Sequence, residues 1–93
     1  MKLIICVVQN KDADGVVDAL TAADYRATRF ASTGGFLRRG NTTIMVGVQD
    51  HQVDHVVEII RDEARKQATT EQEQPGQAAA TIFVLDLEEY QRL

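Results

Sequence analysis

Four stretches of the chain have the composition of β-strands. Residues 3–8 form an unbroken apolar run, residues 42–48 carry β-branched side chains, and residues 25–32 and 79–87 are two further strand candidates. The runs LIICVV and TIFVLDL do not alternate cleanly between apolar and polar positions. Such runs are typical of strands that are buried on both faces.

Two stretches with helical spacing lie between these strands. Asn10–Asp12 offers turn and N-cap residues, and an apolar stripe then continues to Asp24, weakened only by Gly15. Asp50 is predicted to cap a second helix with the most regular stripe in the chain. That stripe consists of Val53, Val56, Val57, Ile60 and Ala64.

The resulting order, βαββαβ, predicts an α+β fold of the ferredoxin-like kind in a single domain over residues 1–93. Residues 67–78 are polar and contain Pro75-Gly76, which predicts a mobile loop before the last strand. Both helices lie on one face of the sheet in this topology. The second face of an apolar sheet then needs another subunit, so the sequence predicts a homo-oligomer.

Composition narrows the classes of function. A chain of 93 residues with a net charge of −4 and a pI near 5.0 is a poor partner for a nucleic-acid polymer, whose backbone requires a basic surface. The apolar N-terminal run is too short for a signal peptide or a membrane span, which predicts a cytoplasmic protein without membrane contact. Cys6 lies within that run and is expected to be a buried, reduced thiol.

Candidate chemistry concentrates between Arg26 and Gly47. This segment contains four arginines, four glycines, several hydroxyl groups and the pair Phe36-Leu37 at a predicted hairpin tip. Glycines such as Gly35 let a backbone approach an anion, while guanidinium groups and an aromatic ring can pair with phosphates or stack on bases. The combination suits a nucleotide.

The same segment resembles a known family. YRAT at 25–28, AST at 31–33, GGFLRRGNTT at 34–43 and Gly47-Val48, together with the opening MKLII and the closing ATIFVL, are similar to the PII-like cyclic-di-AMP receptors. The resemblance implies a homotrimer that binds one cyclic dinucleotide in each of three clefts between subunits. It also implies signalling to a downstream protein of unknown identity, with no catalysis, metal or cofactor.

The resemblance also assigns ligand contacts. It implies that Arg26 supplies a charge or stacks on a base, Thr28 supplies a hydroxyl and Asn41 an amide. It also implies that Gly47 allows close approach to its backbone and that Phe36 and Leu37 line an adenine pocket. Asp24 stands where the family commonly has Asn, Arg92 where it has Gln, and the loop before the last strand is shorter. The expected ligand residues are Asp24, Arg26, Thr28, Gly35, Phe36, Leu37, Asn41, Gly47 and Arg92.

Three other classes of function remain open. A metal-handling trimer of the CutA type has a similar fold, and His51 and His55 have the i, i+4 spacing of metal ligands on a helix. A nitrogen-type PII regulator would bind ATP or ADP, but it would carry a longer segment than 33–41 between the second and third strands. An enzyme is disfavoured because no Ser-His-Asp pattern or Walker-type lysine is apparent.

Overall fold

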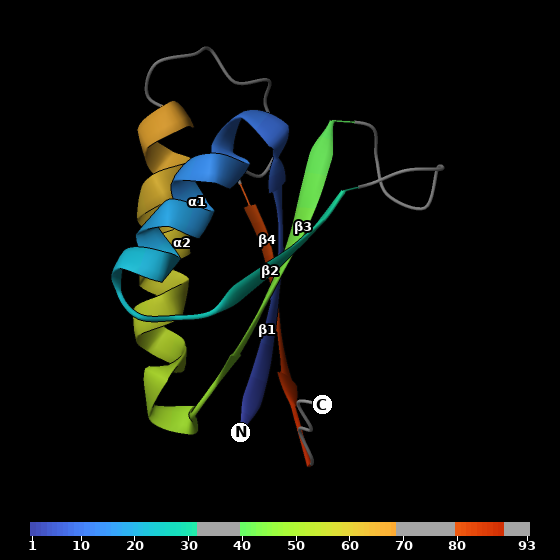
Figure 1. Ribbon diagram of the computed structural model, residues 1–93, viewed down its shortest axis with the longest axis vertical. Helices are drawn as coiled ribbons and strands as arrows, with labels where there is room; N and C mark the ends of the chain where they lie inside the picture. Colours follow the sequence, from blue (N-terminus) through green and yellow to red (C-terminus); the bar gives the residue numbers. More distant parts are fainter. Residues whose placement is uncertain (32–39, 69–79, 89–93) are drawn as a thin grey trace.

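A computed structural model of the chain describes residues 1–31, 40–68 and 80–88. Within these residues, one four-stranded antiparallel sheet packs against two helices that lie together on one of its faces (Figure 1). The elements are β1 (Lys2–Gln9), α1 (Asn10–Ala22), β2 (Ala27–Ala31), β3 (Asn41–Val48), the 3₁₀ turn η1 (Asp50–Gln52), α2 (Val53–Ala68) and β4 (Ala80–Asp86).

The sheet has the strand order β2-β3-β1-β4, so that the first and third strands form its centre. Ile4 of β1 lies opposite Val46 of β3 on one side and Val84 of β4 on the other. This order and the two helices confirm the predicted α+β, ferredoxin-like fold. No helix in the described part of the chain has the length and apolar character needed to cross a membrane.

The core lies between the sheet and the two helices. Every second residue of the central strands points into it, and the stripes of α1 and α2 close it from the other side. Gly15 brings the helices close together, because a Cβ at this position would lie 3.2 Å from Oε2 of Glu63 on α2. The largest buried side chains are Ile4, Val8, Val16, Leu20, Ile44, Val46, Val56 and Ile60.

Both predicted helix caps are wrong. Helix α1 begins at Asn10, directly after β1, and the N–H of Asn10 donates to the carbonyl of Gly40 at 2.8 Å. A backbone acceptor thus replaces the expected side-chain cap. Asp50 begins the turn η1 and pairs with the N-terminal amine at 3.3 Å, while the N–H of Gln49 donates to Oε1 of Gln52 at 2.9 Å.

Two other boundaries also differ from the prediction. Helix α2 continues to Ala68, two residues into the predicted loop, and residues 69–78 lie outside the described part of the chain. Strand β2 begins only at Ala27, because residues after Ala22 still form hydrogen bonds to the last turn of α1. There the N–H of Asp24 donates to the carbonyl of Thr21 at 3.0 Å, and the N–H of Tyr25 donates to that of Leu20 at 2.9 Å.

Candidate functional site

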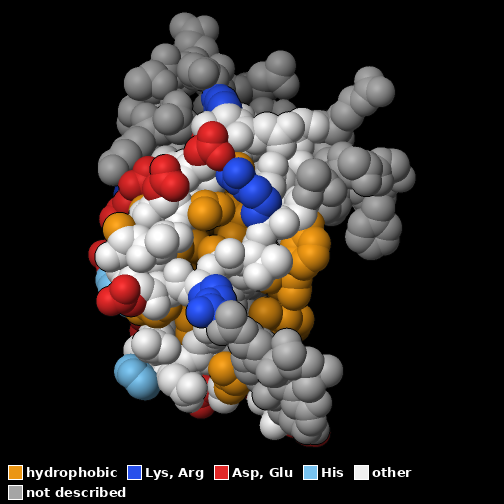
Figure 2. Space-filling model, viewed as in Figure 1, with side chains coloured by type: hydrophobic (Ala, Val, Ile, Leu, Met, Phe, Trp, Pro, Cys, Tyr) orange, Lys and Arg blue, Asp and Glu red, His pale blue; other side chains and the backbone are white. Residues whose placement is uncertain are grey.

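The sheet face that the helices leave uncovered is largely apolar, and we call it the open face. The strand register places on it Leu3 of β1, its neighbours in β3 and β4, and every second residue from there. Figure 2 shows hydrophobic side chains gathered on the sheet side of the molecule. Phe30, Phe83 and Leu85 are each about half exposed. The apolar members of the open face are Leu3, Ile5, Val7, Phe30, Met45, Phe83 and Leu85.

Three of the expected ligand residues share this face. Thr28 of β2 lies opposite Met45 of β3, and Gly47 follows two residues further along β3 on the same side. The structure therefore brings Thr28 and Gly47 close together. Asn41 begins β3 and lies on the same face, but at the other end of the strand.

The separation along β3 divides these residues into two groups. Gly47 and Asn41 are six residues apart, which corresponds to roughly 20 Å in an extended strand. Thr28 belongs to the Gly47 end, and Asn41 marks the Gly40 end of the sheet. The open face thus offers polar groups at both ends with an apolar centre between them.

Nothing in the described residues requires glycine at position 47. Its φ is not positive, and among these residues a Cβ there would meet only the Cε atom of Met1, at 3.9 Å, which is an ordinary contact. Gly40, by contrast, has a φ of +89° that favours glycine. The small size of Gly47 therefore leaves room for a group that approaches the open face from outside the chain.

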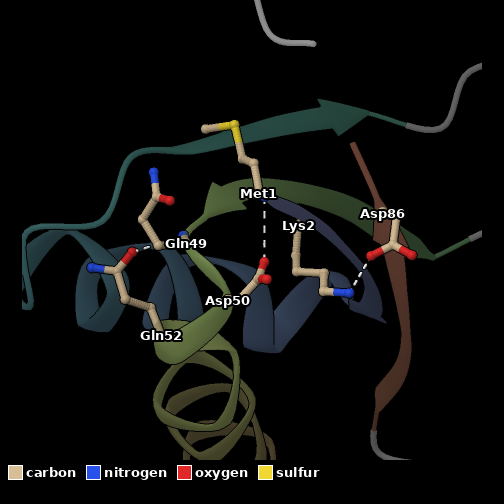
Figure 3. Close-up of polar contacts among 6 residues, drawn as sticks. All are labelled: Met1, Lys2, Gln49, Asp50, Gln52 and Asp86. Carbon is tan, nitrogen blue, oxygen red and sulfur yellow. Dashed lines mark hydrogen bonds and ion pairs between the residues drawn. The ribbon is translucent and has the colours of Figure 1, made fainter. Parts of the chain in front are cut away.

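Polar contacts fix the Gly47 end of the sheet (Figure 3). The N-terminal amine pairs with Asp50, and Lys2 pairs with Asp86 across β1 and β4. The hydrogen bond to Asp86 raises the pKa of the Lys2 ammonium, and the same bond lowers the pKa of the Asp86 carboxyl. Both groups are exposed to solvent, so these ion pairs align the strand ends more than they stabilise the fold.

Asp24 and Arg26 lie in the connection between α1 and β2. Asp24 has a φ of 67°, and the two hydrogen bonds from its own N–H and that of Tyr25 give the Schellman pattern that ends many helices. Asp24 therefore has a structural role that the sequence did not reveal. In the described part of the chain, Asp24 and Arg26 form no ion pair with each other.

Four of the expected ligand residues cannot be placed. Gly35, Phe36, Leu37 and Arg92 lie outside the described residues, so their assignment stays a prediction from the resemblance.

The histidines do not form a metal centre in the described residues. His55 is engaged with Tyr25, whose hydroxyl lies 2.8 Å from Nδ1 and whose ring packs edge-on at a centroid distance of 5.6 Å. Among the described residues, no group of three or more His, Cys, Asp or Glu side chains is placed to hold a metal ion. His51 and His55 alone would supply two ligands, fewer than a stable site requires.

A groove of about 670 Å³ lies between α1 and α2, on the helical layer rather than on the sheet. It contains none of the expected ligand residues. Alanines at the end of α1 lie on one side of it and larger side chains of α2 on the other. The lining residues are Ala19, Ala22, Ala23, His55, Ile59, Asp62, Glu63 and Arg65.

Cys6 is fully buried in the centre of β1, as expected from the sequence. Burial raises the pKa of its thiol to about 11, so the reactive thiolate is scarce at neutral pH. Cys6 is thus a core residue and not a nucleophile.

Sequence reasoning missed Asn10 as a residue near the candidate site. The sequence indicates only a turn or N-cap role for Asn10, whereas its side chain contacts Thr42 at the start of β3. The contact joins residues 32 positions apart, and no local pattern in the sequence signals it.

Two comparisons with known proteins agree with this geometry. The whole chain, residues 1–93, matches the family described as the cyclic-di-AMP receptor. A solved structure of a functionally unknown protein from Pediococcus pentosaceus ATCC 25745 is 33% identical, with a TM-score of 0.75, and the match covers 99% of this chain and 96% of that chain. The chain therefore belongs to the cyclic-di-AMP receptor family.

Proposed function

We propose that this protein is a non-enzymatic signal-transduction protein that binds cyclic di-AMP in clefts between the subunits of a homotrimer. The family match over the whole chain carries the ligand assignment. The proposal includes a cytoplasmic location, the absence of a cofactor, and a downstream protein that responds to the bound state.

The open face supports the assembly. Seven apolar side chains on one sheet face, several of them about half exposed, form the kind of surface that a soluble chain covers with a partner. A second copy of the same chain presents the same apolar face. Association therefore buries on each subunit what neither can bury alone.

The division of the open face into two ends supports a cleft between subunits. If one subunit contributes Thr28 and Gly47 and its neighbour contributes Asn41, groups that are far apart in one chain meet across the interface. A ligand with two bases and two phosphates has matching parts for both sets of groups. Binding at such a junction also couples ligand and assembly.

The side chains have the chemistry that these contacts require. Arg26 supplies a planar cation for a phosphate or a base, the Thr28 hydroxyl and the Asn41 amide donate and accept hydrogen bonds, and Gly47 allows close approach to its backbone. Phe36 and Leu37 would enclose an adenine. Nothing in this arrangement requires a bond to be made or broken.

A ligand panel tests the proposal directly. Sedimentation should show a trimer without ligand, and titration calorimetry should detect cyclic di-AMP binding, with cyclic di-GMP, ATP and ADP as competitors of different shape. A ligand that binds the folded state raises the melting temperature as its concentration exceeds Kd. Binding of ATP or ADP in preference to cyclic di-AMP would favour the nitrogen-type PII alternative, and a monomer at micromolar concentration would contradict the assembly.

Phe36→Ala tests the expected adenine pocket. Loss of one aromatic stacking surface should weaken cyclic di-AMP binding by about 1–3 kcal/mol. The trimer should persist, as measured by sedimentation. An unchanged affinity would show that Phe36 does not contact the ligand.

A further inference from the structure

Asn10 contacts three consecutive residues at the start of β3. Its side-chain amide lies 2.6 Å from the Thr42 hydroxyl oxygen and 3.2 Å from the carbonyl oxygens of Gly40 and Asn41. Two carbonyl groups can only accept hydrogen bonds, so the orientation that satisfies all three neighbours directs Nδ2 toward them. In that orientation the two N–H groups of the amide are shared among the three acceptors of residues 40–42.

The backbone adds a fourth contact between the same segments. The N–H of Asn10 donates to the carbonyl of Gly40 at 2.8 Å, at a residue whose φ of +89° is itself demanding. Thr42 is buried, with 8% exposure, and its hydroxyl meets the Asn10 amide. The first residue of α1 therefore holds the point at which the chain enters β3.

This point carries one of the expected ligand residues. Asn41 lies between Gly40 and Thr42, and its own carbonyl is one of the acceptors of the Asn10 amide. Its backbone position fixes where its side chain begins on the open face. A shift of the 40–42 backbone would move that side chain directly.

We infer that Asn10 is a positioning residue of the ligand site, which holds residues 40–42 so that Asn41 is placed at its end of the open face. The inference rests on the proposed function in one respect, namely that Asn41 contacts the ligand. Asn10 itself acts through the backbone of its neighbours and need not touch the ligand.

Four variants distinguish the effect of the hydrogen bonds of Asn10 and Thr42 from the effect of the shape of these side chains. Asn10→Ala removes the amide, and Asn10→Asp keeps the shape but presents oxygens that cannot donate to the two carbonyls. Thr42→Val removes the hydroxyl at constant shape, and Thr42→Ser keeps it. We expect both Asn10 variants to bind cyclic di-AMP about tenfold more weakly and Thr42→Val several-fold more weakly, with Thr42→Ser close to wild type. The double variant Asn10→Ala/Thr42→Val should lose less affinity for cyclic di-AMP than the product of the fold-losses of the two single variants, because the two side chains share one contact.

Val56→Ala serves as the matched control for stability. Val56 is a fully buried residue of α2, remote from the Asn10 contacts, so its truncation lowers the melting temperature without affecting them. It should bind cyclic di-AMP as the wild type does at temperatures where both are folded. An affinity loss equal to that of Asn10→Ala would reduce Asn10 to a stability residue and overturn the inference, as would wild-type affinity in Asn10→Asp.

Hydrogen exchange of the ligand-free protein distinguishes failure of this inference from failure of the proposed function. Asn10→Ala should accelerate amide exchange at the start of β3, in a peptide covering residues 41–48, and Val56→Ala should do so only to the extent that it lowers global stability. Unchanged exchange in Asn10→Ala overturns the positioning role whether or not ligand binds. If the wild type binds no cyclic di-AMP while exchange accelerates as expected, the proposed function fails and the structural hold of Asn10 stands.

Discussion

Asp24 occupies a backbone conformation that suits other residues better. At the end of α1 its φ of 67° lies in the left-handed region, where glycine and asparagine are the usual residues. Its carboxylate also lies at the negative end of the helix dipole, and the last turn of α1 has no basic residue to offset it. Both effects make aspartate a costly choice for the fold.

Asp24→Asn should therefore stabilise the protein. Removal of the charge and the better fit to a positive φ should raise the free energy of unfolding by about 0.5–1 kcal/mol. The melting temperature should rise by roughly 2–8 °C for a chain of this size. Asp54→Asn is the matched control, because it removes the same charge from the first turn of α2, where it is favourable, and should lower stability slightly.

The same substitution should also change ligand affinity. A carboxylate near a ligand with two phosphates repels it, and Asp24 is exposed and not paired with Arg26 in the described residues. Asp24→Asn should tighten cyclic di-AMP binding by up to roughly tenfold, with a smaller gain at high salt. Calorimetry at two salt concentrations measures both, and weaker binding by the variant would show that the carboxylate accepts a hydrogen bond from the ligand.

Gly47→Ala distinguishes the role of Gly47 in folding from its role in ligand binding. The chain accommodates a Cβ at this position, and alanine is less costly than glycine in a strand by about 0.5–1 kcal/mol. Stability should be unchanged or higher, while cyclic di-AMP binding should weaken by about tenfold through steric crowding. Gly40→Ala, by contrast, should lower the stability of the fold, because Gly40 has a positive φ. Wild-type affinity in Gly47→Ala would remove Gly47 from the site.

Individual residue roles could be predicted from the sequence only where a local pattern carried them. The resemblance singled out Thr28, Asn41 and Gly47, but their shared face follows from the register of β1, β2 and β3, which no short segment encodes. The capping role of Asp24 depends on a single backbone angle. The contacts of Asn10 join distant segments, so they were invisible as well.

At the scale of elements, α1 and α2 meet at Gly15, which in the sequence only weakened the prediction of a helix. The Cβ that Gly15 lacks would lie 3.2 Å from the end of the Glu63 side chain, closer than most real contacts. That neighbour is a carboxylate at the end of a flexible side chain, which has to move by only a few tenths of an ångström. The helix itself loses stability by having glycine in its interior.

Gly15→Ala should therefore stabilise the protein by about 0.5 kcal/mol, since the gain in helix propensity of roughly 1 kcal/mol exceeds the cost of moving Glu63. Urea denaturation measures the change. Ala19→Gly, one turn later on the same helix, should lose about 1 kcal/mol and calibrates the propensity term. A loss of stability in Gly15→Ala would mean that Glu63 cannot move without breaking a contact of its own.

The elements were predicted well because their hydrophobic periods are strong. All four strands and both long helices lie within a few residues of the predicted ranges. The errors are at the ends, where tertiary contacts replaced local signals: the Gly40 carbonyl replaced a side-chain cap at Asn10, and the N-terminal amine engaged Asp50.

At the scale of the whole molecule, the proposal assigns assembly to the open face, and β4 offers a matched pair of positions to test it. Phe83 and Val84 are adjacent and similarly exposed, at 52% and 45%, but the register places Phe83 on the open face and Val84 on the helix side. Phe83→Asp should dissociate the proposed trimer, because it places a charge on the apolar face that the interface would bury. Val84→Asp should leave the trimer intact.

Sedimentation velocity measures the mass of each variant, and the melting temperature of the wild type should rise with protein concentration as expected for an obligate oligomer. Dissociation by Val84→Asp with an intact Phe83→Asp trimer would place the interface on the other side of β4. In β1, Ile4, Cys6 and Val8 are buried by the chain's own helices, whereas Leu3 and Ile5 are only half-buried. The predicted homo-oligomer, which would cover Leu3 and Ile5, stays a prediction.

The pairing of β1 with β4 also governs the order of events during synthesis. Lys2 lies opposite Asp86, so β1 leaves the ribosome well before the residues of β4 that pair with its second edge. Contacts of such long sequence separation slow folding, because the loop they close must be ordered first. At 5–20 residues per second the nascent β1 remains without this neighbour for roughly 5–20 s. The edge of β1 that pairs with β4 is therefore unpaired for much of translation, and depletion of chaperones should lower the yield of folded protein.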